Sequence, residues 1–319
     1  MPMGTRVSAI AGLALLISAT AVVAARQITV PAVVLPTART ANVFFARTMI
    51  NGAGPFWLTI DTGATLTVLD PATVRTLGLP ARPAGQFANV GVGEAVTDMA
   101  TTTGVTLKIG EAPEFAPVPL YVVSVGANAG FRGQQIDGVL GTDFLRRFVV
   151  EFDYAANRVL LHQPGAFEYR GPGERVPMTV QGNVLLAAAR LSLPDGEATM
   201  TRLLVDTGSS QGLSLNSPFV ARHRLAERLQ QPMEAGATRR ASVSIGINGV
   251  ITSQMIKLPS LAFGSTAIAG PDAALSTASE GLTATDRFDG IIGAALLRDF
   301  RVIVDYPRRE IVLERIASR

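Results

Sequence analysis

Two sequence blocks occur twice in this chain, in the same order. The segment WLTIDTGATLTVLD (57–70) is echoed by RLLVDTGSSQGLSLN (202–216), and their DTG tripeptides are 145 residues apart. Residues 136–162 align without gaps to residues 288–314, and ten of these 27 positions are identical. Solenoid repeats are only about 20–50 residues long. The sequence therefore predicts a duplicated domain, with two similar halves in one chain.

The length and composition agree with two folded domains. The chain has 319 residues, which suits two domains of about 150 residues each. Hydrophobic residues make up 48% and charged residues 17%, so each half can bury a core. We expect an N-terminal lobe over residues 26–168 and a C-terminal lobe over residues 169–319, with the connection in the turn-rich segment 163–176.

The residue types that are rare or missing limit the chemistry. The chain has no cysteine and two histidines, His162 and His223, both of which we expect at the surface. This excludes disulfide scaffolds, iron–sulfur clusters and cysteine nucleophiles, and leaves little for a histidine metal site. We expect no metal and no cofactor, so carboxylates or hydroxyls must carry any hydrolytic chemistry.

The charge gives no sign of a nucleic-acid partner. Lys and Arg number 28 against 25 Asp and Glu, which gives a net charge of +3, and no basic run exceeds two residues. A phosphate-binding surface needs clustered Lys and Arg side chains. We therefore expect no nucleic-acid binding.

Residues 1–25 have the features of a signal peptide. Arg6 precedes the apolar run 8–23, and Ala24 and Ala25 supply small residues for cleavage. The alternative is an uncleaved anchor, because about 18 apolar residues approach the length of a membrane span. Both interpretations predict an exported protein, periplasmic or secreted, with no membrane contact beyond this segment.

Strands and turns dominate the remaining pattern. Segments 42–50 and 55–60 flank Asn51-Gly52, and segments 186–193 and 200–205 flank Pro194-Asp195-Gly196, so both pairs predict hairpins. Short helices are expected after Asp70-Pro71 and Ser217-Pro218, the second extending to residue 229, and at 142–148 and 294–300. The Ala-, Ser- and Thr-rich stretch 265–286 predicts a surface loop. The expected fold class is all-β, with few short helices.

An aspartate ends an apolar strand in each half, namely Asp61 and Asp206. A carboxylate at such a place is costly unless it is paired or hydrogen-bonded. If the two halves meet about a pseudo-twofold axis, the two carboxyl groups share one proton. One can then act as a general base on water and the other as a general acid toward a carbonyl oxygen. The following threonine of each motif can bond across to the other loop.

The repeated DTG, each followed downstream by apolar-apolar-Gly, resembles the pepsin-like and retropepsin-like aspartic peptidases over nearly all of the chain after the signal segment. The resemblance implies a two-lobed, pseudo-twofold acid-protease β-barrel fold with Asp61 and Asp206 as the catalytic pair. It also implies a ψ-shaped loop formed by Val139-Leu140-Gly141 and by Ile291-Ile292-Gly293. The residues that it implies in support of the pair are Thr62, Gly63, Ala64, Thr207, Gly208 and Ser209.

The motifs combine features of both groups of peptidases. Ala64 is the retropepsin-like residue, whereas Ser209 is the pepsin-like one, whose hydroxyl can donate to the carboxylate and make the halves electrostatically unequal. Pepsin-like enzymes carry a tyrosine on a flap hairpin, but the expected flap, about residues 88–106, has none. Gly91 and Gly93 are the candidate hinges of this flap.

These features predict an exported aspartic endopeptidase that acts on peptides or proteins. A monomer is expected, because both aspartates belong to one chain. The alternative is a catalytically silent relative that binds peptides or envelope components. A third interpretation is a serine hydrolase, since Gly208-Ser209-Ser210-Gln211-Gly212 matches G-x-S-x-G, with Ser210 as nucleophile.

Overall fold

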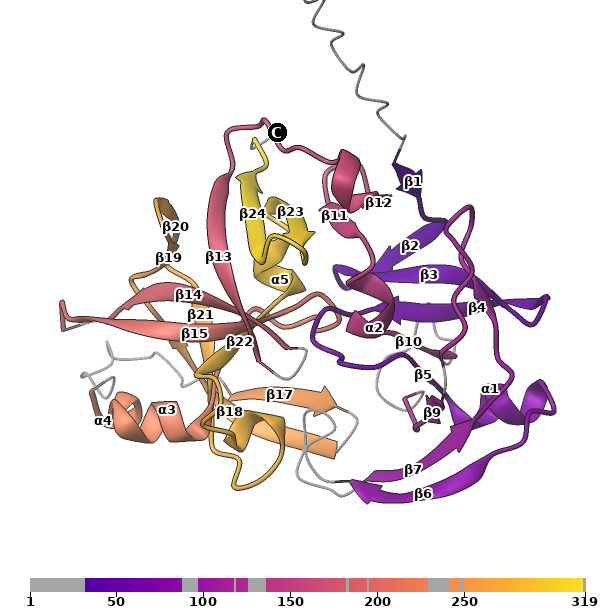
Figure 1. The fold of residues 1–319 in the computed structure, drawn as a ribbon. Coiled ribbons are helices and arrows are strands. Elements are labelled where there is room, and N and C mark those ends of the chain that lie inside the picture. Colours follow the sequence, from indigo (N-terminus) through magenta and orange to yellow (C-terminus); the bar gives the residue numbers. More distant parts are fainter. Residues whose placement is uncertain are drawn as a thin grey trace, which may run out of the picture.

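The computed structural model describes residues 32–87, 97–117, 119–125, 136–181, 184–193, 195–228, 241–246 and 249–317. The predicted signal peptide, residues 1–25, lies outside these ranges. Strands dominate the described part of the chain, the helices are short, and the strands form two sheets (Figure 1). This confirms the all-β fold class and agrees with a two-lobed acid-protease fold. None of the described helices is long and apolar enough to span a membrane.

The smaller sheet belongs to the first half of the chain. Within the described residues its order is β2-β3-β4-β10-β5-β9-β7-β6, with β8 beside β3. The strands are β2 (Thr37–Thr40), β3 (Val43–Ile50), β4 (Ala53–Ile60), β5 (Val68–Leu69), β6 (Arg82–Phe87), β7 (Thr97–Thr102), β8 (Leu107–Lys108), β9 (Leu120–Val122) and β10 (Gly138–Leu140).

The larger sheet runs from the middle of the molecule into the second half. Its described order is β1-β12-β11-β23-β24-β13-β14-β15-β22-β16-β21-β18-β17, and β19 pairs with β14 and β20. Its first-half strands are β1 (Val33–Val34), β11 (Val149–Asp153) and β12 (Arg158–His162). Its second-half strands are β13 (Glu174–Gln181), β14 (Val184–Ser192), β15 (Ala198–Asp206), β16 (Leu213–Leu215), β17 (Ala241–Gly246), β18 (Gly249–Lys257), β19 (Ser260–Phe263), β20 (Thr266–Ala269), β21 (Asp272–Ser276), β22 (Gly290–Gly293), β23 (Phe300–Asp305) and β24 (Glu310–Arg315).

The two halves join through strands β11 and β23. They pair antiparallel from Val149 opposite Asp305 to Asp153 opposite Arg301. These strands occupy equivalent places within the duplicated blocks 136–162 and 288–314, and in Figure 1 they lie at the top, between the two lobes. The main core cluster likewise contains residues of both halves, among them Phe152 and Phe300. The halves therefore share one continuous core and one sheet.

Both expected hairpins are present. Strands β3 and β4 pair around Asn51 and Gly52. The φ angles of these two residues are 49° and 78°, in the left-handed region that asparagine and glycine adopt more readily than other residues. Strands β14 and β15 pair from Leu186 opposite Leu204 to Ser192 opposite Ala198. Local turn signals were therefore sufficient to predict these hairpins.

The helices are shorter than predicted. Helix α1 (Pro71–Thr76) begins as expected, because the Asp70 side chain accepts a hydrogen bond from the Ala72 amide at 2.8 Å. Helices α2 (Thr142–Leu145) and α5 (Ala294–Leu297) span one turn each. Two 3₁₀ turns complete the described helices, η1 (Pro164–Ala166) and η2 (Leu282–Ala284).

The helix predicted after Ser217-Pro218 differs in two ways. Its N-cap is Asn216, and the Ser217 hydroxyl instead donates to the Ala278 carbonyl oxygen at 2.6 Å. The helix is also divided into α3 (Ser217–Arg222) and α4 (Leu225–Arg228), because Arg224 adopts a φ of 49° that no α-helix continues through.

The prediction of a surface loop over 265–286 is wrong. The segment contains β20, β21 and η2, and β21 lies inside the sheet between β16 and β18. Ala273, Ala274 and Leu275 of β21 are buried. Small alanine side chains fit a strand that is covered on both faces, and this packing cannot be seen in the local sequence.

Candidate active site

Each candidate aspartate is fixed at the end of a buried strand. Asp61 directly follows β4, and Asp206 is the last residue of β15. Leu58, Ile60, Leu203 and Val205 are buried on these strands. A parallel neighbour supports each strand, β10 beside β4 and β22 beside β15. The core therefore fixes the backbone from which both carboxyl groups project.

The two carboxyl groups lie against each other. A hydrogen bond links the Asp61 and Asp206 side chains. A Cβ atom added to Gly208 would come within 2.3 Å of Asp61 Cγ, and one added to Gly63 within 2.7 Å of Asp206 Cγ. Each glycine thus faces the carboxyl group of the other half. Any larger residue at these positions would push into that group.

Backbone amides hold each carboxylate in place. Oδ1 of Asp61 accepts from the amides of Gly63 (2.7 Å) and Ala64 (3.1 Å). Oδ1 of Asp206 accepts in the same way from the amides of Gly208 and Ser209, both at 2.9 Å. The two loops therefore orient their carboxyl groups identically, as expected for two copies of one motif.

The threonines of the two motifs interlock across the halves. The Thr62 hydroxyl donates to the Val205 carbonyl oxygen at 2.7 Å, and the Thr207 hydroxyl donates to the Ile60 carbonyl oxygen at 3.0 Å. Each hydroxyl also accepts a hydrogen bond from the amide of the opposite threonine. Both residues are buried, so these four bonds form away from competing water.

Burial and mutual charge set the protonation of the pair. Burial raises the pKa of both Asp61 and Asp206, and the charge of Asp61 raises the pKa of Asp206 further, well above its usual value. The backbone amides act in the opposite direction on both groups. The two carboxyl groups therefore titrate as a coupled pair. This pair keeps one proton at pH values at which two separate carboxyl groups would both be ionised.

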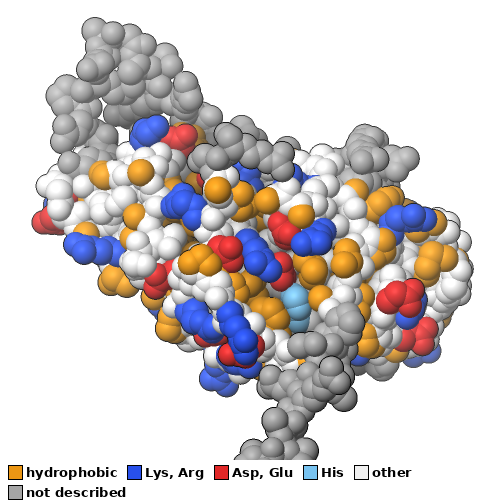
Figure 2. All heavy atoms as spheres, turned by 90° about the horizontal axis from the view of Figure 1, so that it is seen from above, with side chains coloured by type: hydrophobic (Ala, Val, Ile, Leu, Met, Phe, Trp, Pro, Cys, Tyr) orange, Lys and Arg blue, Asp and Glu red, His pale blue; other side chains and the backbone are white. Residues whose placement is uncertain are grey.

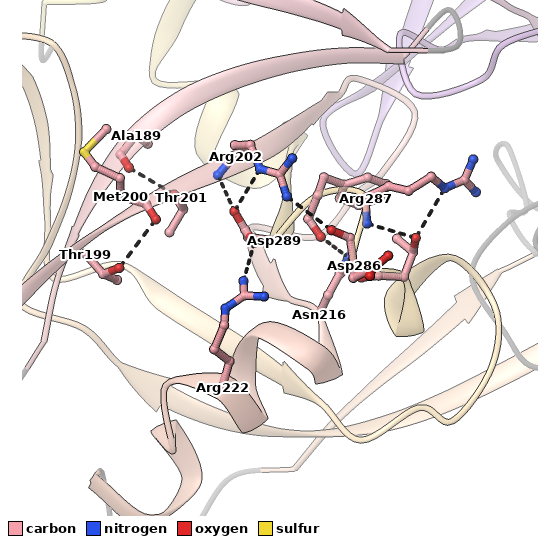
Figure 3. A network of polar contacts seen from close by, with 12 residues as sticks. Ala189, Thr199, Met200, Thr201, Arg202, Asn216, Arg222, Asp286, Arg287 and Asp289 are labelled. Carbon is pink, nitrogen blue, oxygen red and sulfur yellow. Dashed lines mark hydrogen bonds and ion pairs between the residues drawn. The ribbon is translucent and has the colours of Figure 1, made fainter.

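The ψ-loop strands are tied to the helices beside them. In the second half, Asp289 Oδ1 accepts from the Arg222 guanidinium and Oδ2 from the Arg202 amide, both at 2.8 Å (Figure 3). In the first half, Asp137 accepts from the Thr73 hydroxyl at 3.0 Å. The two equivalent aspartates are therefore held by different residue types, Asp289 by an arginine of α3 and Asp137 by a threonine of α1.

The residues after the two glycines make the halves unequal in one respect. Ala64 has no hydroxyl, whereas the Ser209 hydroxyl accepts a hydrogen bond from the Gln211 amide at 3.3 Å. The bond from position 209 to Asp206 comes from the backbone amide. The expected bond from the Ser209 hydroxyl to the carboxylate is thus not observed, and this hydroxyl instead accepts a bond within its own loop.

Three further sequence hypotheses concern a serine nucleophile, the flap hinges and a metal site. Ser210 is exposed, and strand β16 follows it instead of the helix that a serine-hydrolase nucleophile requires. The candidate flap hinges Gly91 and Gly93 lie outside the described residues. No cluster of three or more His, Asp or Glu side chains that could hold a metal ion occurs in the part of the chain that the structure describes.

His162 is not the surface residue that the sequence predicted. Its ring is half-buried, and Nε2 lies 2.8 Å from Oε2 of Glu151. Glu151 is itself buried and accepts from Arg301 of the second half at 2.7 Å. Figure 2 looks down on this side of the molecule, where Lys and Arg side chains lie among acidic and hydrophobic ones. The pairing of β11 with β12 and β23 creates this contact, so no local pattern indicates it.

Two tyrosines were not predicted as site residues, the buried Tyr154 and the half-buried Tyr306. Burial raises the pKa of both hydroxyls, and the charge of Asp206 acts in the same direction on Tyr154, as the charge of Asp61 does on Tyr306. The available signal was the Asp-Tyr dipeptide that both copies of the second repeated block contain, at 153–154 and 305–306.

Comparison with known proteins agrees with this geometry. Among curated proteins, no sequence matches the chain. Residues 46–144 match the family model described as aspartyl protease. This segment contains Asp61 and its supporting residues, together with the first ψ-loop strand. The chain is therefore similar to aspartyl proteases over residues 46–144, and this similarity suggests aspartic peptidase activity.

Proposed function

We propose that this protein is an exported aspartic endopeptidase that hydrolyses peptide bonds with a water molecule activated by Asp61 and Asp206. The observation that carries the proposal is the pair of hydrogen-bonded carboxyl groups held by matching amides from the two DTG loops. The family match over residues 46–144 supports the same reaction class.

The reaction begins with one proton on the pair. The ionised carboxylate takes a proton from water, and the resulting hydroxide attacks the carbonyl carbon of the peptide bond. The other carboxyl group donates its proton to the carbonyl oxygen, giving a neutral tetrahedral intermediate. When the intermediate collapses, the proton of the pair passes to the leaving nitrogen and the C–N bond breaks. One hydroxyl of the intermediate gives its proton to the ionised pair as the new carbonyl group forms. The pair then holds one proton again.

Substrates of this enzyme are peptides or proteins in an extended conformation. An extended chain can bond to the protein through its backbone, as in strand addition. Strand β7, which pairs antiparallel with β6, lies within segment 88–106, which the sequence predicts to close over the substrate as a flap. Both aspartates belong to one chain, which supports a monomer. The apolar run 8–23 after Arg6 supports export to the periplasm or the medium.

Digestion of an unfolded protein mixture tests the proposal. The purified full chain is incubated from about pH 3 to pH 7, the range in which coupled carboxyl groups titrate, and cleavage sites are identified by mass spectrometry. Asp61→Asn and Asp206→Asn keep the shape of the pair but cannot share its proton. Asp195→Asn, at an exposed aspartate, is the matched control.

Cuts made by the unmodified protein and the control, and lost in both dyad variants, support the endopeptidase. Equal cutting by the dyad variants would overturn it. The absence of a tyrosine from residues 88–106 favours a second candidate, a peptide-binding module without turnover. Folded protein that binds unfolded chains and releases no products at any pH would establish that alternative.

A further inference from the structure

The strands beside the two aspartates follow the same order in both halves. That order is β4-β10-β5-β9-β7-β6 in the first half and β15-β22-β16-β21-β18-β17 in the second (Figure 1). The directions also agree, because β5 and β16 run parallel to β9 and β21, whereas β7 and β18 run antiparallel to them. Residues on these strands can therefore be matched between the halves by their register.

The register identifies the counterparts one strand at a time. Val139 and Ile291 are equivalent in the second repeated block, and they pair with Val68 and Ser214, so these two are counterparts. The pairing of β9 and β7, and of β21 and β18, extends the match in the same way. The further counterparts, with the first-half residue given first, are Tyr121 and Ala274, Val123 and Ser276, and Met99 and Ser253.

In the first half these residues form one apolar cluster. Alternate residues of β5 and β9 point away from the main core, and on that side Val68 and Val123 are buried. Ala64, Met99 and Tyr121 pack against them and remain partly exposed. Ala64 directly follows the first DTG tripeptide, and Met99 lies on β7, within the predicted flap segment. The cluster thus connects the catalytic loop with the strand of the predicted flap.

The second half has a small side chain at each of these five positions, and four of them carry a hydroxyl. The residues are Ser209, Ser214, Ser253, Ala274 and Ser276. The Ser209 hydroxyl accepts from the Gln211 amide at 3.3 Å and still carries a proton that it can donate. Ile291, the copy of Val139, is apolar but packs with Leu186 and Phe288 in a different cluster.

The loops after the two aspartates differ in the same sense. A Cβ atom added to Gly141 would lie 2.5 Å from the Leu66 carbonyl oxygen, and one added to its copy Gly293 would lie 2.5 Å from the Gln211 carbonyl oxygen. Leu66 and Gln211 are therefore counterparts. The Leu66 side chain is 37% exposed, so the first half presents apolar surface here as well, where the second half has an amide.

The symmetry of the pair relates these two surfaces to a bound substrate. The reciprocal bonds between the two motif threonines are those of a twofold relation that passes beside the carboxyl groups. Such an axis reverses the direction of an extended chain bound across it. Equivalent surfaces of the two halves then contact substrate residues at equal distances on opposite sides of the cleaved bond.

We propose that the two surfaces select different side chains of the substrate. The first half takes a large apolar side chain against Met99, Tyr121 and Leu66. The second half takes a small or hydrogen-bonding side chain at the position equally far on the other side of the cleaved bond. This specificity rests on the proposed function, because it concerns the substrate of the same aspartate pair.

Cleavage-site profiling tests the proposal. The full chain digests an unfolded protein mixture, and mass spectrometry identifies the residues on both sides of every cut that the Asp61→Asn variant does not make. Large apolar residues should be enriched at one position, and small or polar residues at the position equally far on the other side. The same preference on both sides of the bond would overturn the proposal.

Exchange of the counterparts gives the sharper comparison. Leu66→Gln combined with Met99→Ser gives the first half the residues of the second, and should lower its preference for apolar over polar side chains about tenfold or more. Gln211→Leu should raise the acceptance of apolar residues at the opposite position. Met200→Ser is the matched control, at an exposed methionine of β15 outside the cluster. Preferences that both exchanges leave unchanged, or that the control changes equally, would overturn the proposal. If the combined variant fails to fold, Gln211→Leu carries the test.

Peptide binding separates this proposal from the proposed function. The Asp206→Asn chain selects binders from a pool of random decapeptides, which mass spectrometry then sequences. The selected peptides should be enriched in large apolar residues, and Leu66→Gln with Met99→Ser should remove that enrichment. Cleavage that survives Asp61→Asn rejects the aspartate mechanism alone. Binders without apolar enrichment, or with an enrichment that the two substitutions leave unchanged, reject the specificity.

Discussion

Thr62 and Thr207 each accept a hydrogen bond from the backbone amide of the other, at 3.1 Å and 3.2 Å respectively. Their hydroxyls donate in turn to carbonyl oxygens of the opposite strand. The two halves are thus fastened together directly beside the aspartates. These bonds hold the two DTG loops together, and with them the backbone that carries both carboxyl groups.

Removing either threonine hydroxyl should destabilise the protein. Thr62→Ala leaves the Val205 carbonyl and the Thr207 amide without their buried partner, at a cost of about 1–3 kcal/mol. Thr62→Ser keeps the hydroxyl and should cost clearly less. Urea unfolding measures both variants. Equal stability of Thr62→Ala and the unmodified protein would show that the contact does not hold the lobes together.

Adding one methyl group to Gly208 should abolish activity. The new Cβ would lie within 2.3 Å of Asp61 Cγ, so the carboxyl group must move out of its hydrogen bonds. A displacement of about 1 Å at a reacting group costs on the order of 100-fold in rate. Gly165→Ala is the control, because nothing lies within 4 Å of the added atom there. Peptide cleavage that is equal for the two variants would contradict the geometry.

The pH dependence of stability should reveal the raised pKa of Asp206. The folded-state pKa of Asp206 is raised, so its contribution to stability is fully present below its unfolded pKa and is lost as pH rises through the folded value. Asp206→Asn removes this loss. The variant should therefore unfold at a higher temperature than the unmodified protein near neutral pH, and at a similar temperature in acid. Parallel curves across the whole range would show that the two carboxyl groups do not share a proton.

Glu151 should give the opposite pH dependence. Burial acts to raise its pKa, but hydrogen bonds from His162 and Arg301 outweigh burial and hold the pKa below its usual value. Its contribution to stability is present above the unfolded pKa and is lost as pH falls through the folded one. Glu151→Gln should cost about 1–3 kcal/mol at neutral pH, with a smaller loss in acid.

The exposed Glu168, paired with Arg170, supplies the control for this experiment. Exposed ion pairs add little to stability because water screens them, so Glu168→Gln should leave the unfolding curve nearly unchanged. The role assigned to Glu151 is wrong if both variants unfold at the same urea concentration.

Much of this molecule could be predicted because its signals are local or repeated. Asn51-Gly52 specifies a hairpin turn, and Asp70-Pro71 specifies a helix start, through interactions between neighbouring residues. The meeting of Asp61 with Asp206 is a long-range contact, yet the duplication implies it. Once the two copies are related by a pseudo-twofold axis, equivalent strand ends face each other.

What the sequence did not indicate depends on contacts between distant segments. The Ser217 hydroxyl bonds to Ala278, 61 residues away, and so does not cap its own helix. His162 meets the buried Glu151 because β12 pairs with β11, and Glu151 meets Arg301 because β11 also pairs with β23. Segment 265–286 is polar and small in composition, but the neighbours of β21 bury it.

The most direct test of the central claim is the kcat/KM of a single peptide, taken from a site cut in the digestion, for four proteins. These are the unmodified chain, Asp61→Asn, Asp206→Asn and the double variant, each shown to be folded by circular dichroism. Because the two carboxyl groups act as one unit, each single variant should lose about 1,000-fold or more and the double variant little beyond that. A single variant that retains activity within tenfold of the unmodified chain would contradict the account.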